Sequence, residues 1–405
     1  MLNTIYSAYT GMLSFSKGLN VLSNNVSNMN TPGFKSSEVT FRDLFYQYSS
    51  DGSQQEGHQS QVGEGTDVSG TRINFSQGQL GSTGNPLDVA ITGNGFFVLR
   101  DGADTYYTRT GQFDLNADGI LIDKAGGAHV QADSDGNLHD INLAGLQTSA
   151  AKPTSEVDLV GNLSRGATSD QISSLTVFDT VGGSHALALT FTNNDTATPG
   201  SWLVEVQDEN KQSIASGEIR FNADGSPATG FNALSFSLAP GAVPASTITL
   251  NFGAVGSLTG ATNFSGGTAS DLKVNTQDGY ASGSLITTSF DAQGFITLKY
   301  SNGQNAKGPQ LALAWFNNLQ QLHQLGNELF ANTSGMTPLL GSADGQFMGT
   351  LTSENIERSN VDLTQQFTDL VIIQRGYQSA SQVISVANQM IQQLIDMRTG
   401  GSSAG

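Results

Sequence analysis

Apolar residues repeat with a period of seven at the N-terminal end of the chain. Two positions of each heptad are apolar, and they are Ile5, Met12, Leu19 and Val26, followed three residues later by Ala8, Phe15, Leu22 and Met29. A pair of apolar positions per heptad, kept over four repeats, is typical of a helix that packs against another helix along a narrow stripe. We therefore expect a helix over residues 1–30.

The C-terminal end carries the same pattern. Its apolar positions are Leu370, Tyr377, Ile384 and Ile391, then Ile373, Ala380, Ala387 and Leu394, with Leu363 and Phe367 upstream. The sequence from Ser359 to Asp362 fits a capping box of the S-x-x-[DE] type, which predicts that a helix begins there. The glycine-rich tail from Gly400 to Gly405 predicts its end.

Between the two ends the period falls to two. Short apolar runs are bounded by Gly, Asn and Asp clusters, which is typical of β-strands. The runs are 87–91, 96–99, 175–178, 187–191, 202–206 and 247–250. Three further segments place an aromatic residue before a tight turn that contains Gly, and they predict recurring β-hairpins with a positive-φ turn residue. These segments are 113–120, 221–225 and 290–296.

These patterns predict a mainly β chain with α-helical termini. The terminal helices form a coiled-coil base, and a β-domain carries a second, inserted β-sandwich or barrel. The expected domains are a helical base (1–33 plus 360–405), a connecting segment (34–70), a discontinuous β-domain (71–145 plus 277–359) and an inserted outer β-domain (146–276).

Composition narrows the range of functions. Charged residues are 13% of the chain and the net charge is −18, whereas about 25% is usual for globular proteins. Lys and Arg are not clustered, so binding to nucleic acid or to an anionic membrane is not expected. The chain has no cysteine, which excludes disulfides and thiolate metal sites.

No targeting segment is recognisable. Lys17 is the one cation in the first twenty residues, and it follows the apolar positions instead of preceding them. No run of about 18 apolar residues is present, so no membrane insertion is expected. If the protein leaves the cell, we expect export without a cleaved signal peptide.

Catalytic and metal-binding motifs are not found. The five histidines stand at unrelated spacings. Residues 303–308 begin like a phosphate-binding loop, but Pro309 stands where lysine is required. Residues 133–137 resemble a calcium loop with its glycine too early, and a solvated turn is the better interpretation. Paired carboxylates for sugar hydrolysis stay open, because nothing singles out a pair. We expect no enzyme activity, no cofactor and no metal.

The terminal stripes favour self-assembly over a private helix pair. A two-helix hairpin leaves much of each stripe in water, and every side chain left there forgoes about 1.5–3 kcal/mol of burial. Subunits that cover one another would recover this free energy. Glutamines crowd the C-terminal helix, and they fit either a polar lumen or an ordinary solvated face; they are Gln365, Gln366, Gln374, Gln378, Gln382, Gln389, Gln392 and Gln393.

Two segments resemble the signatures of the flagellar rod and hook axial protein family. The first is 24–35, whose distinctive residues are Asn24, Asn25, Asn28, Gly33 and Phe34. The second is 357–363 with 374–378, whose distinctive residues are Ser359, Asn360, Asp362, Leu363, Gln374, Arg375, Tyr377 and Gln378. Further stretches match in order at 78–80, 85–91, 95–97, 107–113, 276–280 and 300–303.

The resemblance implies a structural role. Rod proteins are shorter and lack a large middle insertion, so the length of this chain favours a hook subunit. Such subunits assemble into a flexible curved tube that couples motor and rod to the filament. The implied partners are copies of the same chain, the distal rod protein, the hook cap protein, the hook–filament junction protein and the flagellar type III export apparatus. The implied location is extracellular, in the flagellar hook.

Three alternatives remain open at this point. The start of the chain, Met1 to Tyr6, also occurs among rod proteins, so a distal rod protein is the nearest alternative. A secreted polysaccharide-binding or polysaccharide-degrading β-protein fits the polar surface but leaves the two heptad stripes unexplained. An adhesin or surface-layer subunit also polymerises, but it would ordinarily carry a cleavable signal.

Overall fold

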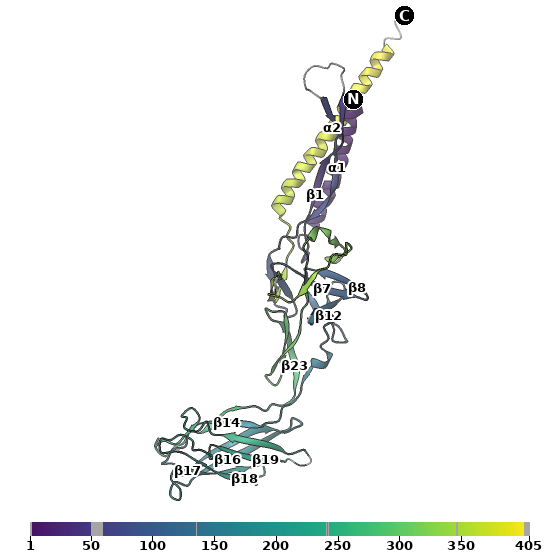
Figure 1. Cartoon of the computed structure of the whole chain (residues 1–405). Coiled ribbons are helices and arrows are strands. Elements are labelled where there is room, and N and C mark those ends of the chain that lie inside the picture. Colours follow the sequence, from purple (N-terminus) through teal and green to yellow (C-terminus); the bar gives the residue numbers. More distant parts are fainter. Residues whose placement is uncertain are drawn as a thin grey trace. The chain divides into compact units, whose positions relative to one another are not determined.

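The computed structural model describes residues 2–49, 60–134, 136–239, 241, 243–345 and 347–400. Within them the chain is mainly β, with one α-helix at each end: α1 (Leu2–Ser27) and α2 (Leu363–Gly400) (Figure 1). The predicted fold class is confirmed. Residues 50–59 of the predicted connecting segment and the tail 401–405 lie outside the described residues.

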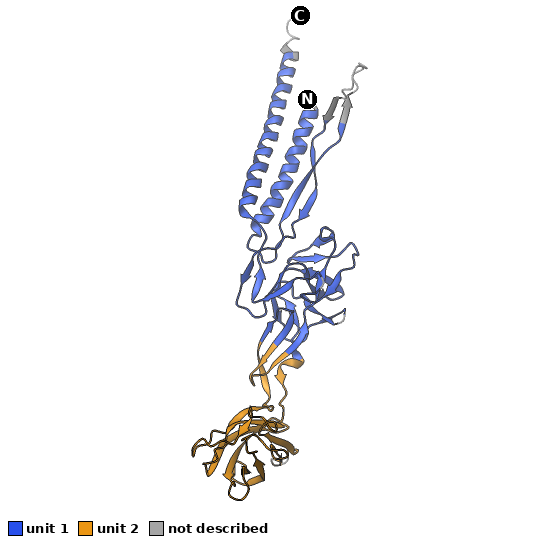
Figure 2. Cartoon of the chain, turned by 60° about the vertical axis from the view of Figure 1, so that its left-hand side comes forward, with its two compact units in different colours: residues 1–144, 288–297, 307–405 blue, residues 145–287, 298–306 orange. Residues whose placement is uncertain are grey.

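The chain divides into two compact units (Figure 2). Unit 1 contains residues 1–144, 288–297 and 307–405, and unit 2 contains residues 145–287 and 298–306. The finer separation of a helical base, a connecting segment and a β-domain within unit 1 stays a prediction, as do the predicted limits 146–276 of the inserted domain.

Both helices differ from the prediction at one end. α1 ends at Ser27, so residues 28–30 are not helical. The Asn28 side chain donates to the Asn24 carbonyl at 2.9 Å and closes the helix, and Pro32 disfavours helix just beyond. α2 begins at Leu363, because Asp362 Oδ1 accepts the N–H of Thr364 at 2.8 Å. The predicted capping box at Ser359 is therefore wrong; Asp362 is itself the N-cap.

A two-stranded ribbon lies beside α1 in unit 1. It pairs β1 (Ser37–Asp43) with β4 (Thr66–Ile73), and β2 (Tyr46–Ser49) pairs with β3 (Ser60–Gly63). The Phe41 ring of β1 lies 6.1 Å from the Phe15 ring of α1, which packs the ribbon onto the helix.

A ten-stranded sheet forms the β part of unit 1. Its strands run in the order β27 (His323–Gln324), β28 (Leu329–Ala331), β8 (Asp104–Thr108), β7 (Phe96–Asp101), β11 (His129–Ser134), β10 (Leu121–Asp123) and β9 (Phe113–Leu115), with β12 (Asn137–Asp140) on β11, β26 (Leu313–Trp315) on β7, and β29 (Leu339–Gly341) on β26. Its core is aromatic: the ring of Phe96 lies 5.7 Å from that of Phe330 and 6.1 Å from that of Phe316.

Two short pairings bring the end of the β part back to its start. β30 (Thr350–Ser353) pairs with β6 (Val89–Thr92), and β31 (Asn355–Glu357) pairs with β5 (Leu80–Ser82). The second pairing fixes the chain a few residues before α2. The 3-10 turns are η1 (Ala144–Leu146) and η2 (Leu319–Gln321).

Unit 2 is a β-sandwich. One sheet runs β15 (Ser169–Phe178), β16 (Ser184–Asn193), β17 (Ser201–Gln207) and β18 (Ser213–Arg220). The other runs β19 (Ala233–Leu238), β20 (Ser246–Asn251), β14 (Glu156–Asn162) and β21 (Ala261–Thr262), with β22 (Lys273–Gln277) on β14. Alternate residues of both sheets share one core around Trp202, which is 1% exposed.

The two ends of the sandwich segment are tied together. Lys152 and Tyr280 exchange backbone hydrogen bonds of 3.0 Å in both directions. Asp278 accepts the N–H groups of Ser155 at 2.8 Å and Glu156 at 3.0 Å, and Lys152 Nζ lies 3.2 Å from its carboxylate. A further sheet, β13 (Thr148–Ser149), β23 (Gly283–Phe290), β24 (Phe295–Tyr300) and β25 (Asn305–Gln310), contains residues of both units.

The recurring turns are confirmed. Gly119, Gly225 and Gly294 have φ of 74°, 83° and 84°, and each donates its N–H to the carbonyl three residues earlier. Glycine adopts a positive φ without a Cβ clash, which explains why a glycine stands in the turn of each of these three segments.

Candidate assembly site

The two terminal helices lie antiparallel and side by side in unit 1 (Figures 1 and 2). Most predicted stripe positions are buried or half-buried; they are Ile5, Ala8, Met12, Phe15, Leu19, Leu22, Val26, Leu363, Leu370, Ile373, Ala380, Ile384, Ala387 and Ile391. Four positions differ: Met29, Phe367, Tyr377 and Leu394 are 37%, 54%, 37% and 51% exposed. Met29 also lies beyond the end of α1, so its predicted place on that helix is wrong.

Two glycines let the helices approach closely. A Cβ at Gly376 of α2 would stand 2.6 Å from the Phe15 ring, and a Cβ at Gly18 of α1 would stand 2.9 Å from Ile373. Each helix therefore receives a large side chain of its partner over a glycine. The heptad pattern did not signal these two positions, because they fall between the apolar ones.

α2 carries a second apolar surface that no described residue covers. Its exposed fractions range from 40% to 73%, and the residues are Phe367, Val371, Ile372, Val383, Val386, Met390, Leu394 and Met397. Exposed apolar patches of this kind are typical of a site that binds another protein.

Part of the C-terminal signature faces solvent. Gln374, Arg375 and Gln378 are exposed, and their side chains make no hydrogen bond or ion pair with another described residue. These three side chains therefore add no hydrogen bond or ion pair to the described part of the monomer.

Asn25 of the N-terminal signature joins three elements. It is fully buried, and its Nδ2 donates to the Ser37 carbonyl at 2.8 Å and to Gln366 Oε1 at 2.9 Å. Its Oδ1 accepts the Ser37 N–H at 2.9 Å. One amide thus fixes the end of α1 to β1 and to the first turn of α2. The sequence singled out Asn25, but it placed Gln366 among the glutamines of a lumenal or solvated face, whereas Gln366 is only 9% exposed.

Asn360 does the same on the C-terminal side. Its Oδ1 accepts the Ser36 N–H at 2.8 Å, and its Nδ2 donates to the Asn74 carbonyl at 2.7 Å. Ser359 is half-buried and its hydroxyl oxygen accepts the Val361 N–H at 3.4 Å. The chain before α2 is therefore bound to the segments on either side of the β1–β4 ribbon.

Gly33 and Phe34 lie at the centre of this junction. Gly33 has φ of 70°, and a Cβ there would stand 2.7 Å from Thr110, so this position requires glycine. Its N–H donates to the Glu357 carbonyl at 2.8 Å. Phe34 is 5% exposed.

A buried charged triad completes the junction. Lys35 Nζ lies 2.5 Å from Glu357 Oε1, and Arg109 Nη1 lies 3.5 Å from Glu357 Oε2. The three residues are between 1% and 4% exposed. The Gly78 N–H also donates to Glu357, at 2.7 Å, and Lys35 donates to the Ser76 carbonyl at 2.8 Å. Burial lowers the pKa of Lys35, and the charge and hydrogen bond of Glu357 oppose that shift.

Sequence reasoning missed this triad. Lys35, Arg109 and Glu357 stand inside the stretches that carry the family resemblance, but nothing in their spacing pairs them. Their one signal is charge next to apolar and glycine positions in a chain where charged residues are only 13%.

A groove runs along one side of α2. Its volume is about 510 Å³, and it is bounded by the end of α1, by β1 and by the first turns of α2. Its lining is part apolar, through Val39, Phe41 and Ile372, and part acidic, through Glu38, Asp362 and Asp369.

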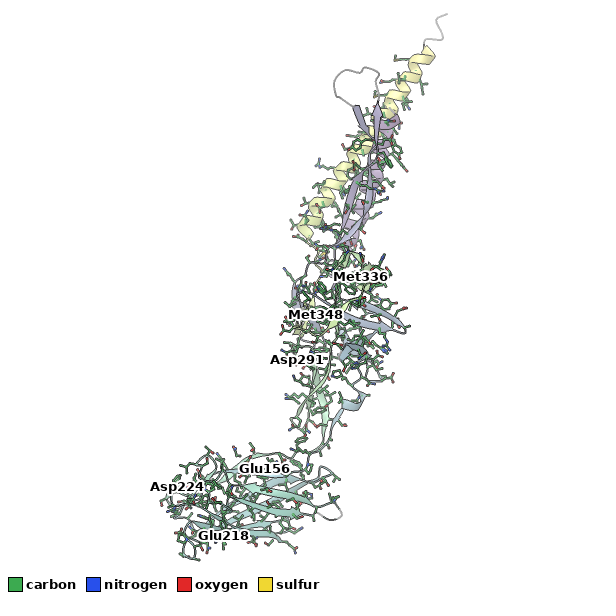
Figure 3. The ribbon with its side chains drawn as sticks, viewed as in Figure 1. Glu156, Glu218, Asp224, Asp291, Met336 and Met348 are labelled. Atoms are coloured by element: carbon green, nitrogen blue, oxygen red, sulfur yellow. The ribbon has the colours of Figure 1, made fainter. Side chains whose placement is uncertain are left out.

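The acidic residues of unit 2 form local hydrogen bonds. Figure 3 labels Glu218 and Asp224 there; Glu218 accepts Arg220 Nε at 2.8 Å, and Asp224 accepts the Ser226 hydroxyl at 2.6 Å. The bond from Arg220 is the main cause that lowers the pKa of Glu218. In the calcium-like segment, the Gly136 N–H donates to Asp133, as a turn requires, while Asp135 lies outside the described residues.

No group of three or more His, Asp or Glu side chains among the described residues is arranged to hold a metal ion. Neither described helix has a stretch that is long and apolar enough to cross a bilayer.

Four family models match successive parts of the chain. They are described as flagella basal body rod protein (residues 5–35), flagellar hook protein FlgE/F/G D1 domain (90–154), flagellar basal body protein FlaE D2 domain (142–280) and flagellar basal body rod FlgEFG protein C-terminal (352–397). The matched segments include both terminal helices and most of unit 2.

Two curated relatives match over nearly their whole length. The flagellar hook protein FlgE of Escherichia coli is 31% identical, over 96% of this chain and 99% of the relative. The flagellar hook protein FlgE of Borreliella burgdorferi is 29% identical, over 98% of this chain and 100% of the relative. A solved structure of Helicobacter pylori flagellar hook protein FlgE2 aligns with a TM-score of 0.45 and 13% identity, over 69% of this chain and 99% of that chain.

The relatives favour the hook over the rod protein and the polysaccharide-binding protein that the sequence left open. The identity to the Escherichia coli protein extends through the helices, the junction and the inserted unit. This chain belongs to the flagellar hook protein family.

Proposed function

We propose that this chain is a hook subunit that assembles with copies of itself through its two terminal helices. The tube that results is flexible and curved, and it couples rod and motor to the filament. The observation that carries this proposal is the uncovered apolar surface of α2, where Val386 and Met390 are 53% and 49% exposed.

Burial of the second apolar surface of α2 would provide the free energy for assembly. The inner stripe of α2 already packs on α1, so the second apolar surface has no partner within the described part of the chain. Covering an aliphatic side chain yields about 1.5–3 kcal/mol. Several such residues on one helix supply enough free energy to hold subunits together, even after the cost of association.

We assign the predicted segments to layers of the tube. The helical base (1–33 plus 360–405) forms the inner layer, and the β-domain (71–145 plus 277–359) and inserted domain (146–276) form outer layers. The stripe residues of both helices act as assembly positions. The exposed glutamines face the lumen, where an uncharged polar surface lets other chains pass.

A hook lies between the rod and the filament, and this position implies further partners. At its base the tube meets the distal rod protein, and at its tip the hook cap protein and later the hook–filament junction protein. The chain reaches its extracellular site through the flagellar type III export apparatus without a cleaved signal peptide. It performs no catalysis and needs no cofactor.

Substitution on the uncovered surface tests the assembly role. The double variant Val386→Gln/Met390→Gln removes apolar area from exposed positions, so we expect the monomer to keep its circular dichroism and thermal unfolding. We expect its critical concentration for tube formation, measured by sedimentation and electron microscopy, to rise at least about tenfold.

The matched control is Val181→Gln/Val255→Gln on unit 2, where the two side chains are 70% and 47% exposed. It removes similar area away from the helices and should leave tube formation unchanged. A wild-type chain that stays monomeric under all polymerising conditions would instead support a private helix pair.

A further inference from the structure

The groove beside α2 is acidic as well as apolar. Of its three carboxylates, Glu38 has a cation near it: Arg72 Nη2 lies 3.7 Å from Glu38 Oε2, and both side chains are more than half exposed. Asp362 caps α2, and Asp369 accepts Gln365 Nε2 at 3.0 Å. Because these bonds do not neutralise the two aspartates, the groove keeps a negative charge.

α2 also carries a row of exposed apolar and cationic residues, which we call the ridge. Phe367, Val371 and Arg375 follow one another at four-residue intervals, which places them in one row along α2. Phe367 and Val371 are 54% and 50% exposed, and Arg375 is exposed without an ion pair among the described residues. The row is apolar at one end and cationic at the other.

Ridge and groove face in different directions. At about 100° per residue, Phe367 of the ridge and Asp369 of the groove are separated by about 160° around the helix axis. A subunit therefore cannot fill its own groove with its own ridge. The two surfaces are free to contact two different neighbours.

We propose that the ridge of one copy of this chain docks in the groove of the next. Phe367 and Val371 pack against Val39, Phe41 and Ile372, and Arg375 pairs with Asp369 and Asp362. This contact rests on the proposed self-assembly, and it specifies which faces of the helices meet and which charge pair sets their register.

The occupant is a second copy because shape and charge both match. Rows of residues four apart fit grooves on a neighbouring helix, and the unpaired cation of the ridge matches the excess negative charge of the groove. The contact uses two different surfaces, so it repeats from copy to copy and builds a helical array instead of a closed dimer.

Charge reversal tests the pairing. Arg375→Glu and Asp369→Lys should each raise the critical concentration for tube formation at least about tenfold, because like charges then meet. The double variant Arg375→Glu/Asp369→Lys restores opposite charges and should return to within about threefold of wild type. Lys124→Glu, an exposed reversal in the β part of unit 1, is the matched control and should have no effect.

Cross-linking provides a second readout. The chain has no cysteine, so Arg375→Cys/Asp369→Cys introduces two thiols that point away from each other within one subunit. Oxidised tubes of this variant should give a ladder of covalent dimers, trimers and longer chains in non-reducing gels. A mixture of the two single-cysteine variants should stop at dimers.

The outcomes separate this contact from assembly in general. Wild-type chains that form no tubes contradict the assembly role itself. If wild-type tubes form but Arg375→Glu polymerises like wild type, or tubes of the double-cysteine variant give no ladder, another surface fills the groove and our docking contact is wrong. If Asp369→Lys fails to fold, Asp369→Ala replaces it: this variant should also raise the critical concentration, and adding Arg375→Ala should raise it no further, because the pair is already broken.

Discussion

Two cations share one carboxylate at the junction below α2. Glu357 is the only anion of the triad, and it receives Lys35, Arg109 and a backbone N–H in a site from which water is excluded. A buried ion pair contributes little by itself, but a buried charge left without its partner is costly. The carboxylate is therefore the member of the triad that the fold can least lose.

Replacing the anion of the triad should destabilise the fold more than replacing one of its cations. Glu357→Gln leaves two buried cations and should lower the free energy of unfolding by about 3–5 kcal/mol. Lys35→Met leaves the Arg109–Glu357 pair intact and removes the hydrogen bond from Lys35 to the Ser76 carbonyl, to which Asn360 still donates at 3.1 Å, so a loss of about 1–3 kcal/mol is expected. Urea unfolding measures both.

Asp67→Asn is the control for the triad. Asp67 forms ion pairs with Lys17 and Arg42 at 3.6 and 3.0 Å on the surface, where such pairs contribute about 0–1 kcal/mol. Equal losses for Glu357→Gln and Asp67→Asn would contradict the proposed importance of the buried carboxylate.

Asp278 links the stability of unit 2 to pH. Burial opposes its ionisation, but hydrogen bonds from the Ser155 hydroxyl and from the N–H groups of Ser155 and Glu156 outweigh burial and hold its pKa well below the usual value. A depressed pKa adds stability above the unfolded-state pKa of about 3.9, and that stability is lost as the pH falls toward the folded-state pKa. Asp278→Asn should therefore cost about 1–3 kcal/mol at pH 7.

Thermal unfolding across pH checks the role of Asp278. Wild type and Asp278→Asn should differ at pH 7, and the difference should shrink steadily as the pH falls below about 4, the unfolded-state pKa. Asp291→Asn serves as a control, since Asp291 accepts backbone N–H groups in the β23–β24 turn of unit 1. A constant difference between wild type and Asp278→Asn at all pH values would exclude ionisation as the cause.

At the scale of single residues, the sequence was informative about local roles and silent about long-range ones. The positive φ of Gly33 and of the turn glycines follows from local chain chemistry. The contacts of Asn25 with Gln366 and of Lys35 with Glu357 join residues 341 and 322 positions apart. No periodicity encodes such pairs, so only the folded chain reveals them.

At the scale of elements, glycine controls the approach of α1 and α2. Gly376 faces the rigid Phe15 ring at 2.6 Å, whereas a Cβ at Gly11 would meet nothing closer than 4.0 Å. Gly376→Ala should therefore destabilise the helix pair by about 1–3 kcal/mol through overpacking. Gly11→Ala should stabilise it by about 0.5–1 kcal/mol, because alanine favours helix.

Both substitutions add one methyl group to a helix, so Gly11→Ala is the matched control for Gly376→Ala. Chemical unfolding followed by far-ultraviolet circular dichroism measures the difference. Two variants that shift stability in the same direction would show that propensity, not packing, dominates at Gly376.

The heptad pattern predicted the two helices better than it predicted their ends. The seven-residue period correctly located both elements and most inward positions, because burial against one partner imposes that period. It extended α1 over residues 28–30, where Asn28 binds the backbone of Asn24 instead of continuing the helix. It placed the start of α2 too early, because Ser359 and Asp362 can both cap a helix and local sequence does not choose between them.

At the scale of the whole molecule, the inserted unit has a hydrophobic core of its own. Its core residues all fall between Val157 and Leu272, and its two ends are held together by Lys152 and Tyr280. We expect a fragment of residues 152–280 to fold alone. Its Trp202 fluorescence should be blue-shifted, and it should unfold cooperatively in urea.

A fragment of the same length that begins at residue 177, within β15, breaks the sandwich and is the control. Red-shifted Trp202 emission in the 152–280 fragment would mean that the inserted unit depends on the rest of the chain. The limits 146–276, which were predicted from a change in residue composition, stay a prediction.

The junction also sets the order in which the chain can fold. Lys35 and Arg109 are made early, but their carboxylate comes 322 residues after Lys35. Closing so long a loop is entropically costly and slow. Before Glu357 and α2 have been made, the two cations have no counter-charge and the end of α1 has no helix to pack against. The triad therefore delays completion of the assembling surface until after residue 357, the residue that supplies its carboxylate, has been added.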